Sequence, residues 1–124
     1  MKTISIVAKI GKPEAVPIAR ELKARHPELT FLAEPHLAIA LGWPQTAPAE
    51  LGAKCDLLVV LGGDGMLIQG ARHLKGRAVP ILGVNLGSLG FMTEISQKDA
   101  TKAFDELLAG KAKIDYRNSG MPPT

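Results

Sequence analysis

The sequence is poor in cysteine and aromatic residues and has no long apolar run. Cys55 is the only cysteine, so it has neither an intrachain disulfide partner nor a metal-binding companion, and we assign it no function. Aromatic residues make up 4% of the chain, too few for the stacking platforms of proteins that bind single-stranded nucleic acid. No apolar stretch reaches the ~18 residues of a membrane helix. We therefore expect no nucleic-acid partner and no membrane partner.

The rest of the composition is typical of one soluble globular domain. The chain has 124 residues, of which 46% are hydrophobic and 22% charged, and its N-terminus lacks the features of a signal peptide, which predicts a cytoplasmic protein. The net charge of +3 comes from scattered basic residues and suits phosphate-rich small ligands. Because the three histidines share no spacing, we interpret His26, His36 and His73 as surface residues and assign no metal ligand.

Apolar β-branched runs alternate with segments of helical period, which is the pattern of a parallel sheet covered by helices. Strands are expected over residues 4–9, 30–33, 56–61 and 79–84, and helices over 13–26, 66–74 and from Ser96, as N-cap, to Gly110. We expect a variable loop over 34–52, with a possible helical turn at 36–41, and a candidate strand at 113–116. The prediction is a three-layer α/β domain over residues 1–116 with a mostly parallel sheet, followed by a disordered tail at 117–124.

Two glycine-rich segments each follow an expected strand. Gly62-Gly63-Asp64-Gly65 follows the strand at 56–61, and the segment from Asn85 to Phe91 follows the strand at 79–84. Ligands of open α/β sheets bind beyond the carboxyl ends of the strands, so we expect both segments at one edge. Glycine lets a phosphate approach backbone N–H groups, and the next helix adds partial positive charge. The first segment therefore predicts a phosphate site, although glycines alone would equally suit tight turns.

The presence of Asp64 indicates that this glycine-rich segment has a chemical role and is not only a turn. A carboxylate among three glycines repels phosphate unless it holds Mg²⁺ or accepts a proton from an attacking hydroxyl. Its alternative role is to cap the helix that follows. The segments match neither GxxxxGK[ST] nor GxGxxG, which excludes the Walker-type P-loop and the dinucleotide fingerprint of dehydrogenases.

Residues 57–65 (LLVVLGGDG) and 81–93 (ILGVNLGSLGFMT) together resemble the NAD kinase family. GGDG also occurs in diacylglycerol kinases, sphingosine kinases and phosphofructokinases, whereas G-x-N-x-G-x-LGF-x-T singles out NAD kinases. The resemblance implies the N-terminal domain of an enzyme that transfers the γ-phosphoryl group of ATP, or of polyphosphate, to the 2′-hydroxyl of the adenosine ribose of NAD. The product would be NADP, the reaction would use Mg²⁺ or another divalent cation, and the full-length protein is expected to be a homo-oligomer.

The same resemblance implies roles for individual residues. Asp64 would be the base that receives the 2′-hydroxyl proton. Phe91 would contact the adenine of NAD, with the alternative role of anchoring its loop in the core. Asn85 would lie beside the same pocket, holding the loop or touching the nucleotide. The phosphates would be lined by Gly62, Gly63 and Gly65.

The sequence departs from the family pattern in two places. Met66 stands where the family normally has Thr, and a thioether cannot donate a hydrogen bond to phosphate. The second, largely β domain of the family, with its Asn-Glu pair, has no counterpart after Tyr116. We therefore expect this chain alone to have little or no activity. The alternatives are a lipid or sugar kinase of the GGDG group and a nucleotide-binding module without catalysis.

Overall fold

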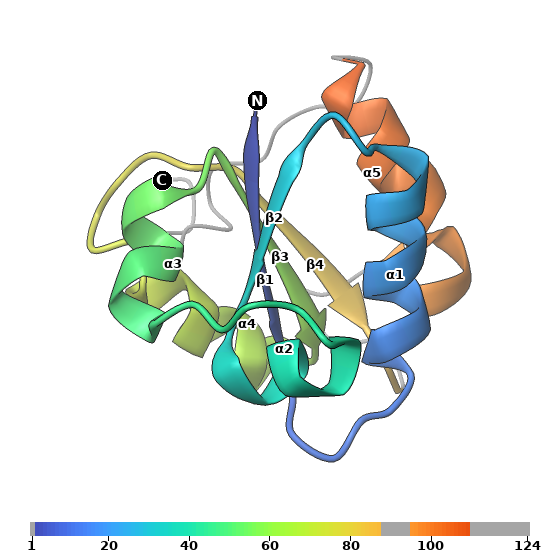
Figure 1. Ribbon diagram of the computed structural model, residues 1–124, viewed down its shortest axis with the longest axis horizontal. Coiled ribbons are helices and arrows are strands. Elements are labelled where there is room, and N and C mark those ends of the chain that lie inside the picture. The colour runs from blue at the N-terminus through green and yellow to red at the C-terminus, as the bar shows by residue number, and fades with distance from the viewer. Residues whose placement is uncertain (1, 88–94, 110–124) are drawn as a thin grey trace.

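The computed structural model describes residues 2–87 and 95–109, which form a five-stranded parallel sheet with helices on both faces (Figure 1). The strand order is β2-β1-β3-β4-β5. The strands are β1 (Thr3–Ala8), β2 (Thr30–Ala33), β3 (Leu57–Gly62), β4 (Ile81–Asn85) and β5 (Ile95–Ser96). The helices are α1 (Ala15–Arg25), α2 (Pro35–Leu41), α3 (Pro48–Lys54), α4 (Asp64–Arg72), the 3₁₀ turn η1 (Gln97–Asp99) and α5 (Ala100–Leu108).

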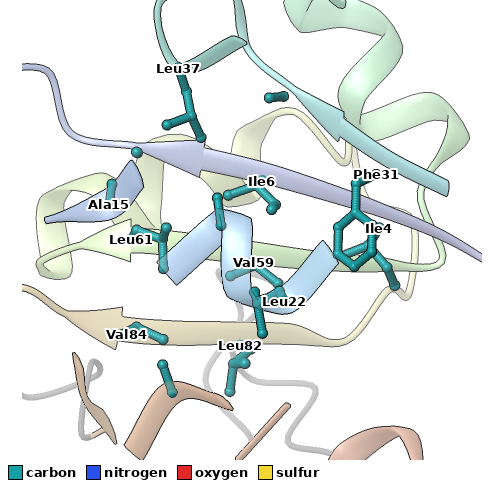
Figure 2. Packing of buried hydrophobic residues seen from close by; sticks show 14 of the residues in the cluster. Ile4, Ile6, Ala15, Leu22, Phe31, Leu37, Val59, Leu61, Leu82 and Val84 are labelled. Carbon is teal, nitrogen blue, oxygen red and sulfur yellow. The ribbon is translucent and has the colours of Figure 1, made fainter. Parts of the chain in front are cut away.

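The centre of the sheet is built from the most apolar segments of the sequence. Every residue of β3 is buried, as expected of a parallel strand covered on both faces. One cluster of buried side chains packs between the sheet and α1, α2 and α5; Figure 2 shows part of it, including Ile6, Val59 and Leu22. A second cluster, with Val60 and Leu67, packs against α3 and α4 on the other face. The predicted α/β fold with a parallel sheet is confirmed.

The structure corrects several expectations about the elements. The possible helical turn at 36–41 is confirmed as α2, but 34–52 is not a variable loop, because α3 follows and both seven-residue helices begin at a proline and bury apolar side chains against the rest of the domain. Helix α4 begins at Asp64, two residues earlier than expected. Ser96 is confirmed as an N-cap, but of the turn η1, which leads into α5, whereas the N-cap of α5 itself is Asp99; the Ser96 hydroxyl donates to the Asp99 carboxylate at 3.1 Å. The short strand β5 was not predicted. The candidate strand at 113–116 and the tail at 117–124 lie outside the described residues.

The order of the strands places a switch point between β1 and β3. From β1 the chain passes through α1 to β2 on one side, and from β3 it passes through α4 to β4 on the other. Helix α1 covers one face of the sheet and α4 the opposite face (Figure 1). The loops that leave β1 and β3 therefore diverge, and such a point is where open parallel sheets form crevices for ligands.

A charged contact joins α1 to α5 at the surface, and it makes stability depend on pH. The Arg25 guanidinium hydrogen-bonds the Asp105 carboxylate, and Nε2 of His26 lies 2.7 Å from Oδ1 of Asp105. The hydrogen bond from Arg25 is the main cause that lowers the pKa of Asp105. A carboxyl group whose pKa is lower in the folded chain adds stability above its unfolded pKa and loses it as pH falls through the folded value.

We expect Asp105→Asn to lower the midpoint of urea denaturation slightly at pH 7, and we expect this difference to diminish as pH falls through the lowered pKa of Asp105, because its carboxyl group then becomes neutral. Denaturation curves across this range measure the difference. Glu106→Gln, an exposed change on the same helix, is the control and should show no comparable pH-dependent difference. A loss for Asp105→Asn that stays the same from pH 7 down to the most acidic pH at which the chain is folded would contradict the electrostatic origin.

Candidate functional site

The carboxyl ends of β1, β3 and β4 meet at one edge of the sheet, at the lower edge of Figure 1. Gly62 is paired with Asn85 in the sheet register, and the Leu86 amide donates to the Gly62 carbonyl at 2.9 Å. On the other side of β3, the Lys9 amide donates to the Leu61 carbonyl at 2.9 Å. The start of the segment from Asn85 thus lies beside the GGDG segment, as the sequence predicted.

Asp64 and the start of the second segment line a common hollow of about 210 Å³, which we call the β4-side hollow. Asp64 is half-buried and occupies the first turn of α4, where a negative charge interacts favourably with the helix dipole. It is not the N-cap, because that position belongs to Gly63. The alternative role of Asp64, as the cap of the helix that follows, is therefore wrong. The other lining residues are Lys9, Lys12, Gly62, Gly63, Asn85, Leu86 and Gly87.

Asn85 shapes the beginning of the second segment. Its side chain is buried, and its Oδ1 accepts a hydrogen bond of 2.7 Å from the Gly87 amide, two residues further along. Such a side-chain bond to the following backbone is typical of a tight Asx turn. This bond constrains the turn over residues 85–87, and the two roles expected of Asn85 stay predictions. Phe91, expected at the same site, lies outside the described residues.

Packing requires glycine at only one of the three glycine positions of the GGDG segment. A Cβ on Gly62 would lie 2.9 Å from Cβ of Met66, so packing of α4 onto the strand end requires glycine there. A Cβ on Gly63 or Gly65 would meet no other atom within 4 Å, and Gly63 has an extended backbone that any residue adopts. Neither the turn nor the packing requires glycine at positions 63 and 65. Their bare main chain borders open space, as a phosphate-binding segment needs.

Two lysines were missed by sequence reasoning. Lys9 and Lys12 follow β1 and line the β4-side hollow together with Asp64. They belong to the segment Lys9-Ile10-Gly11-Lys12, in which Gly11 has a positive φ of 84° and turns the chain. The signal was the pair of lysines around a glycine directly after a strand, but only the position of β1 beside β3 brings them to this site.

A larger hollow of about 480 Å³ lies on the other side of the GGDG segment, and we call it the β1-side hollow. It is lined by Ala8, Lys9, Ile10, Glu34, His36, Gly63, Gly65, Met66 and Gln69. Glu34 Oε1 accepts a hydrogen bond of 3.1 Å from the Ala8 amide and lies 2.8 Å from Nε2 of His36. Burial raises the pKa of Glu34, and the bond from Ala8 opposes that rise. Sequence reasoning also missed Glu34, because its approach to the end of β1 depends on the strand order.

The histidines are less exposed than expected. His26 is half-buried at the surface between α1 and α5, where it packs against Phe104, with 5.2 Å between ring centroids, and lies 2.7 Å from the Asp105 carboxylate. His36 is half-buried in the β1-side hollow. Residues 2–87 and 95–109 contain no group of three or more His, Cys, Asp or Glu side chains that could hold a metal ion. Within that part of the chain, no helix is long and apolar enough to cross a membrane.

Comparisons with known proteins agree on one family. The family model described as the ATP-NAD kinase N-terminal domain matches residues 4–112. The NAD kinase of Geotalea daltonii is 47% identical over 122 residues, and that of Geobacter metallireducens is 42% identical over 119. Both matches cover 94% of this chain and 42% of the relative, so the chain spans well under half the length of these curated relatives.

A solved structure shows the same fold. The crystal structure of yeast NADH kinase complexed with NADH is similar to this chain with a TM-score of 0.78 and 24% sequence identity. The match covers 91% of this chain and 39% of the yeast chain. It supports the three-layer arrangement independently of the sequence motifs.

Proposed function

The chain belongs to the ATP-NAD kinase family, and from that premise we propose that it is the nucleotide-binding part of an NAD kinase. The reaction transfers the γ-phosphoryl group of ATP to the 2′-hydroxyl of the adenosine ribose of NAD and yields NADP and ADP. One observation carries the proposal: Asp64, the bare main chain of the GGDG segment and the Asn85 loop border one hollow at the switch point of the sheet. Because the relatives are more than twice as long, the activity is proposed for a protein that joins this chain to the remaining part.

The chemistry divides among residues of this chain. The 2′-hydroxyl oxygen forms a bond to the γ-phosphorus while the bond from that phosphorus to the oxygen bridging to the β-phosphate breaks, and ADP leaves. Asp64 receives the proton of the hydroxyl. Lys9, Lys12 and the amides at the start of α4 balance the charge on the phosphoryl oxygens. Phosphoryl transfer consists mainly of such positioning and charge stabilisation.

A divalent cation such as Mg²⁺ fits this site only if the phosphates supply most of its ligands. Among the described residues, Asp64 is the one carboxylate that lines the β4-side hollow, and they offer no cluster of three metal ligands. Mg²⁺ typically binds one or two carboxylates together with substrate phosphates. We therefore propose that the substrate phosphates and water would hold the ion, and that Asp64 keeps the role of base. When bound, the ion would neutralise charge on the phosphates.

We also propose a cytoplasmic location, NAD and ATP as the partners, and a homo-oligomer for the full-length protein. No nucleic-acid or membrane partner is proposed. The sparse aromatic residues and the scattered basic charge argue against a nucleic-acid partner. Of the alternatives, the family match favours an NAD kinase over a lipid or sugar kinase.

The test is a chimera in which this chain replaces the matching part of the Geotalea daltonii NAD kinase. We expect the chimera to form NADP from NAD, ATP and Mg²⁺, and the isolated chain to form little or none. A chimera that is folded, as shown by a cooperative thermal transition, yet forms no NADP while the parent relative does would contradict the proposal.

Gly65→Ala tests the open main chain of the phosphate segment. An alanine at this exposed position of α4 raises helix propensity by up to about 1 kcal/mol, so the chain should be as stable as before or slightly more stable. Its methyl group projects into the space that a phosphate needs, and we expect the affinity for ATP to fall about tenfold or more. Urea denaturation and calorimetry measure the two effects. Unchanged affinity would show that no phosphate approaches the main chain at this position.

A further inference from the structure

We propose that the β1-side hollow binds the nucleoside of the phosphoryl donor, while the acceptor hydroxyl enters from the β4-side hollow. The inference rests on the proposed function and adds to it which side of the GGDG segment each substrate occupies. Glu34, His36 and Gln69 would form the donor pocket, a role that the sequence motifs do not indicate. The donor is then a nucleoside triphosphate and not polyphosphate.

The two hollows lie next to each other at the GGDG segment. Gly63 and Lys9 line both of them, so the hollows meet at the turn between β3 and α4. Asp64 and Asn85 line the β4-side hollow, whereas Glu34 lines the β1-side hollow. Asp64, the proposed base, therefore lines the β4-side hollow, and the β1-side hollow has no assigned occupant.

The second step is the geometry of the reaction. In phosphoryl transfer the attacking and leaving oxygens lie roughly in line on opposite sides of the phosphorus. An acceptor hydroxyl that loses its proton to Asp64 must approach from the β4 side. If the γ-phosphoryl group lies over Gly63, the leaving ADP extends toward the β1 side, where the larger hollow is.

The third step is the size and chemistry of the β1-side hollow. Its volume of about 480 Å³ lies within the range of ~300–1,000 Å³ that small-molecule pockets have, whereas the β4-side hollow is smaller. Ile10 is 76% exposed and, with Met66, offers an apolar surface to the face of a base. Glu34, His36 and Gln69 offer hydrogen-bonding groups to its edge and to the ribose. A nucleoside has this combination of an apolar face and polar edges, and polyphosphate does not.

The last step is charge. Glu34 places a carboxylate in this hollow, which disfavours an anion there, while Lys9 lies where the two hollows meet and Lys12 lines the β4 side. The phosphates are therefore better placed near the start of α4 and the lysines, with the uncharged nucleoside beside Glu34. A nucleoside triphosphate with its nucleoside in the β1-side hollow and its γ-phosphate near Asp64 would fit this distribution of charge.

A pair of tryptophan variants on α4 tests the assignment. Gln69 lines the β1-side hollow, and its neighbour Ile68 is exposed on the same helix but does not line it. Gln69→Trp should fill the hollow and weaken the binding of ATP by more than tenfold, whereas Ile68→Trp should leave it within about twofold. His36→Ala should weaken ATP binding by about tenfold, the cost of roughly one hydrogen bond. Calorimetry on the 124-residue chain with ATP, with inorganic tripolyphosphate and with NAD, each with Mg²⁺, measures these effects.

The comparison of ATP, tripolyphosphate and NAD distinguishes a loss of nucleoside binding from a general loss of ligand binding. We expect Gln69→Trp and His36→Ala to leave the affinities for tripolyphosphate and NAD within about twofold of the original chain, because neither contains the donor nucleoside. The inference is overturned if the original chain does not bind ATP, if Gln69→Trp and Ile68→Trp behave alike, or if Gln69→Trp weakens NAD or tripolyphosphate as much as ATP. Failure of the proposed function is a separate result, namely a folded chimera that forms no NADP.

Discussion

Asp64→Asn is expected to lower the rate of NADP formation by roughly 10²- to 10⁴-fold, the usual contribution of a positioned general base. Asn has nearly the shape of Asp, so helix α4 and the β4-side hollow should be preserved, but its amide cannot accept the hydroxyl proton. The affinity for ATP should stay the same or increase slightly, because a negative charge beside the phosphates is removed. Steady-state rates of the chimera with saturating NAD and ATP measure the effect.

The matched control is Asp56→Asn, at the opposite end of the same strand. The Asp56 carboxylate accepts hydrogen bonds from the amides of Lys2 and Thr3 at 2.9 and 3.0 Å, far from the carboxyl edge of the sheet. Those bonds lower the pKa of Asp56, so its replacement should cost a little stability and leave the turnover rate unchanged. If Asp64→Asn kept turnover within about threefold of the original, Asp64 would not be the base.

Gly52→Ala is expected to destabilise the domain by about 3 kcal/mol or more, the upper range for an overpacked core. Helix α3 packs so closely on the end of α4 that a Cβ on Gly52 would lie 1.7 Å from the carbonyl oxygen of His73 and 2.2 Å from its carbonyl carbon. Because those atoms are backbone, no rotamer change relieves the overlap. The side chain of Arg77 also hydrogen-bonds the Gly52 carbonyl, so displacement of α3 would break that contact as well.

The midpoint of urea denaturation measures this loss, with Gly65→Ala as the control. The methyl group of Gly65→Ala meets open space, and we expect this variant to be as stable as the original or slightly more stable. Equal stabilities for Gly52→Ala and the original chain would mean that α3 does not pack on α4 in solution as it does here.

The fold was predictable where local sequence and burial agree. The apolar run that forms β3 is buried on both faces, and β2 was predicted with its observed bounds because Thr30–Ala33 is short and clearly delimited. Helix α2 was predicted only as a possible helical turn at 36–41 and α3 was not predicted, because seven residues hold too few turns for a clear period. Their stability comes from buried contacts such as Leu37 against the core, which only the assembled structure supplies.

The candidate site was predictable to the extent that it follows from strand ends. Parallel strands bring their carboxyl ends to one edge, and so the sequence sufficed to place Asp64 near Asn85. Lys9 and Glu34 could not be predicted, because they reach the site through the order β2-β1-β3, which no local pattern encodes. The resemblance to NAD kinases supplied the family, which the comparisons confirmed. The roles of individual residues remain proposals.

The most direct test of the whole account is a titration of the isotope-labelled chain with ATP and Mg²⁺, followed by the NMR signals of its backbone amides. The central claim is that the turn between β3 and α4 and the loop after β4 border one nucleotide site. We expect the amides of Gly63, Gly65 and Gly87 to shift together, with a single dissociation constant, and those of α3 to stay in place. Shifts confined to one of the two loops, or located at the opposite edge of the sheet, would contradict it.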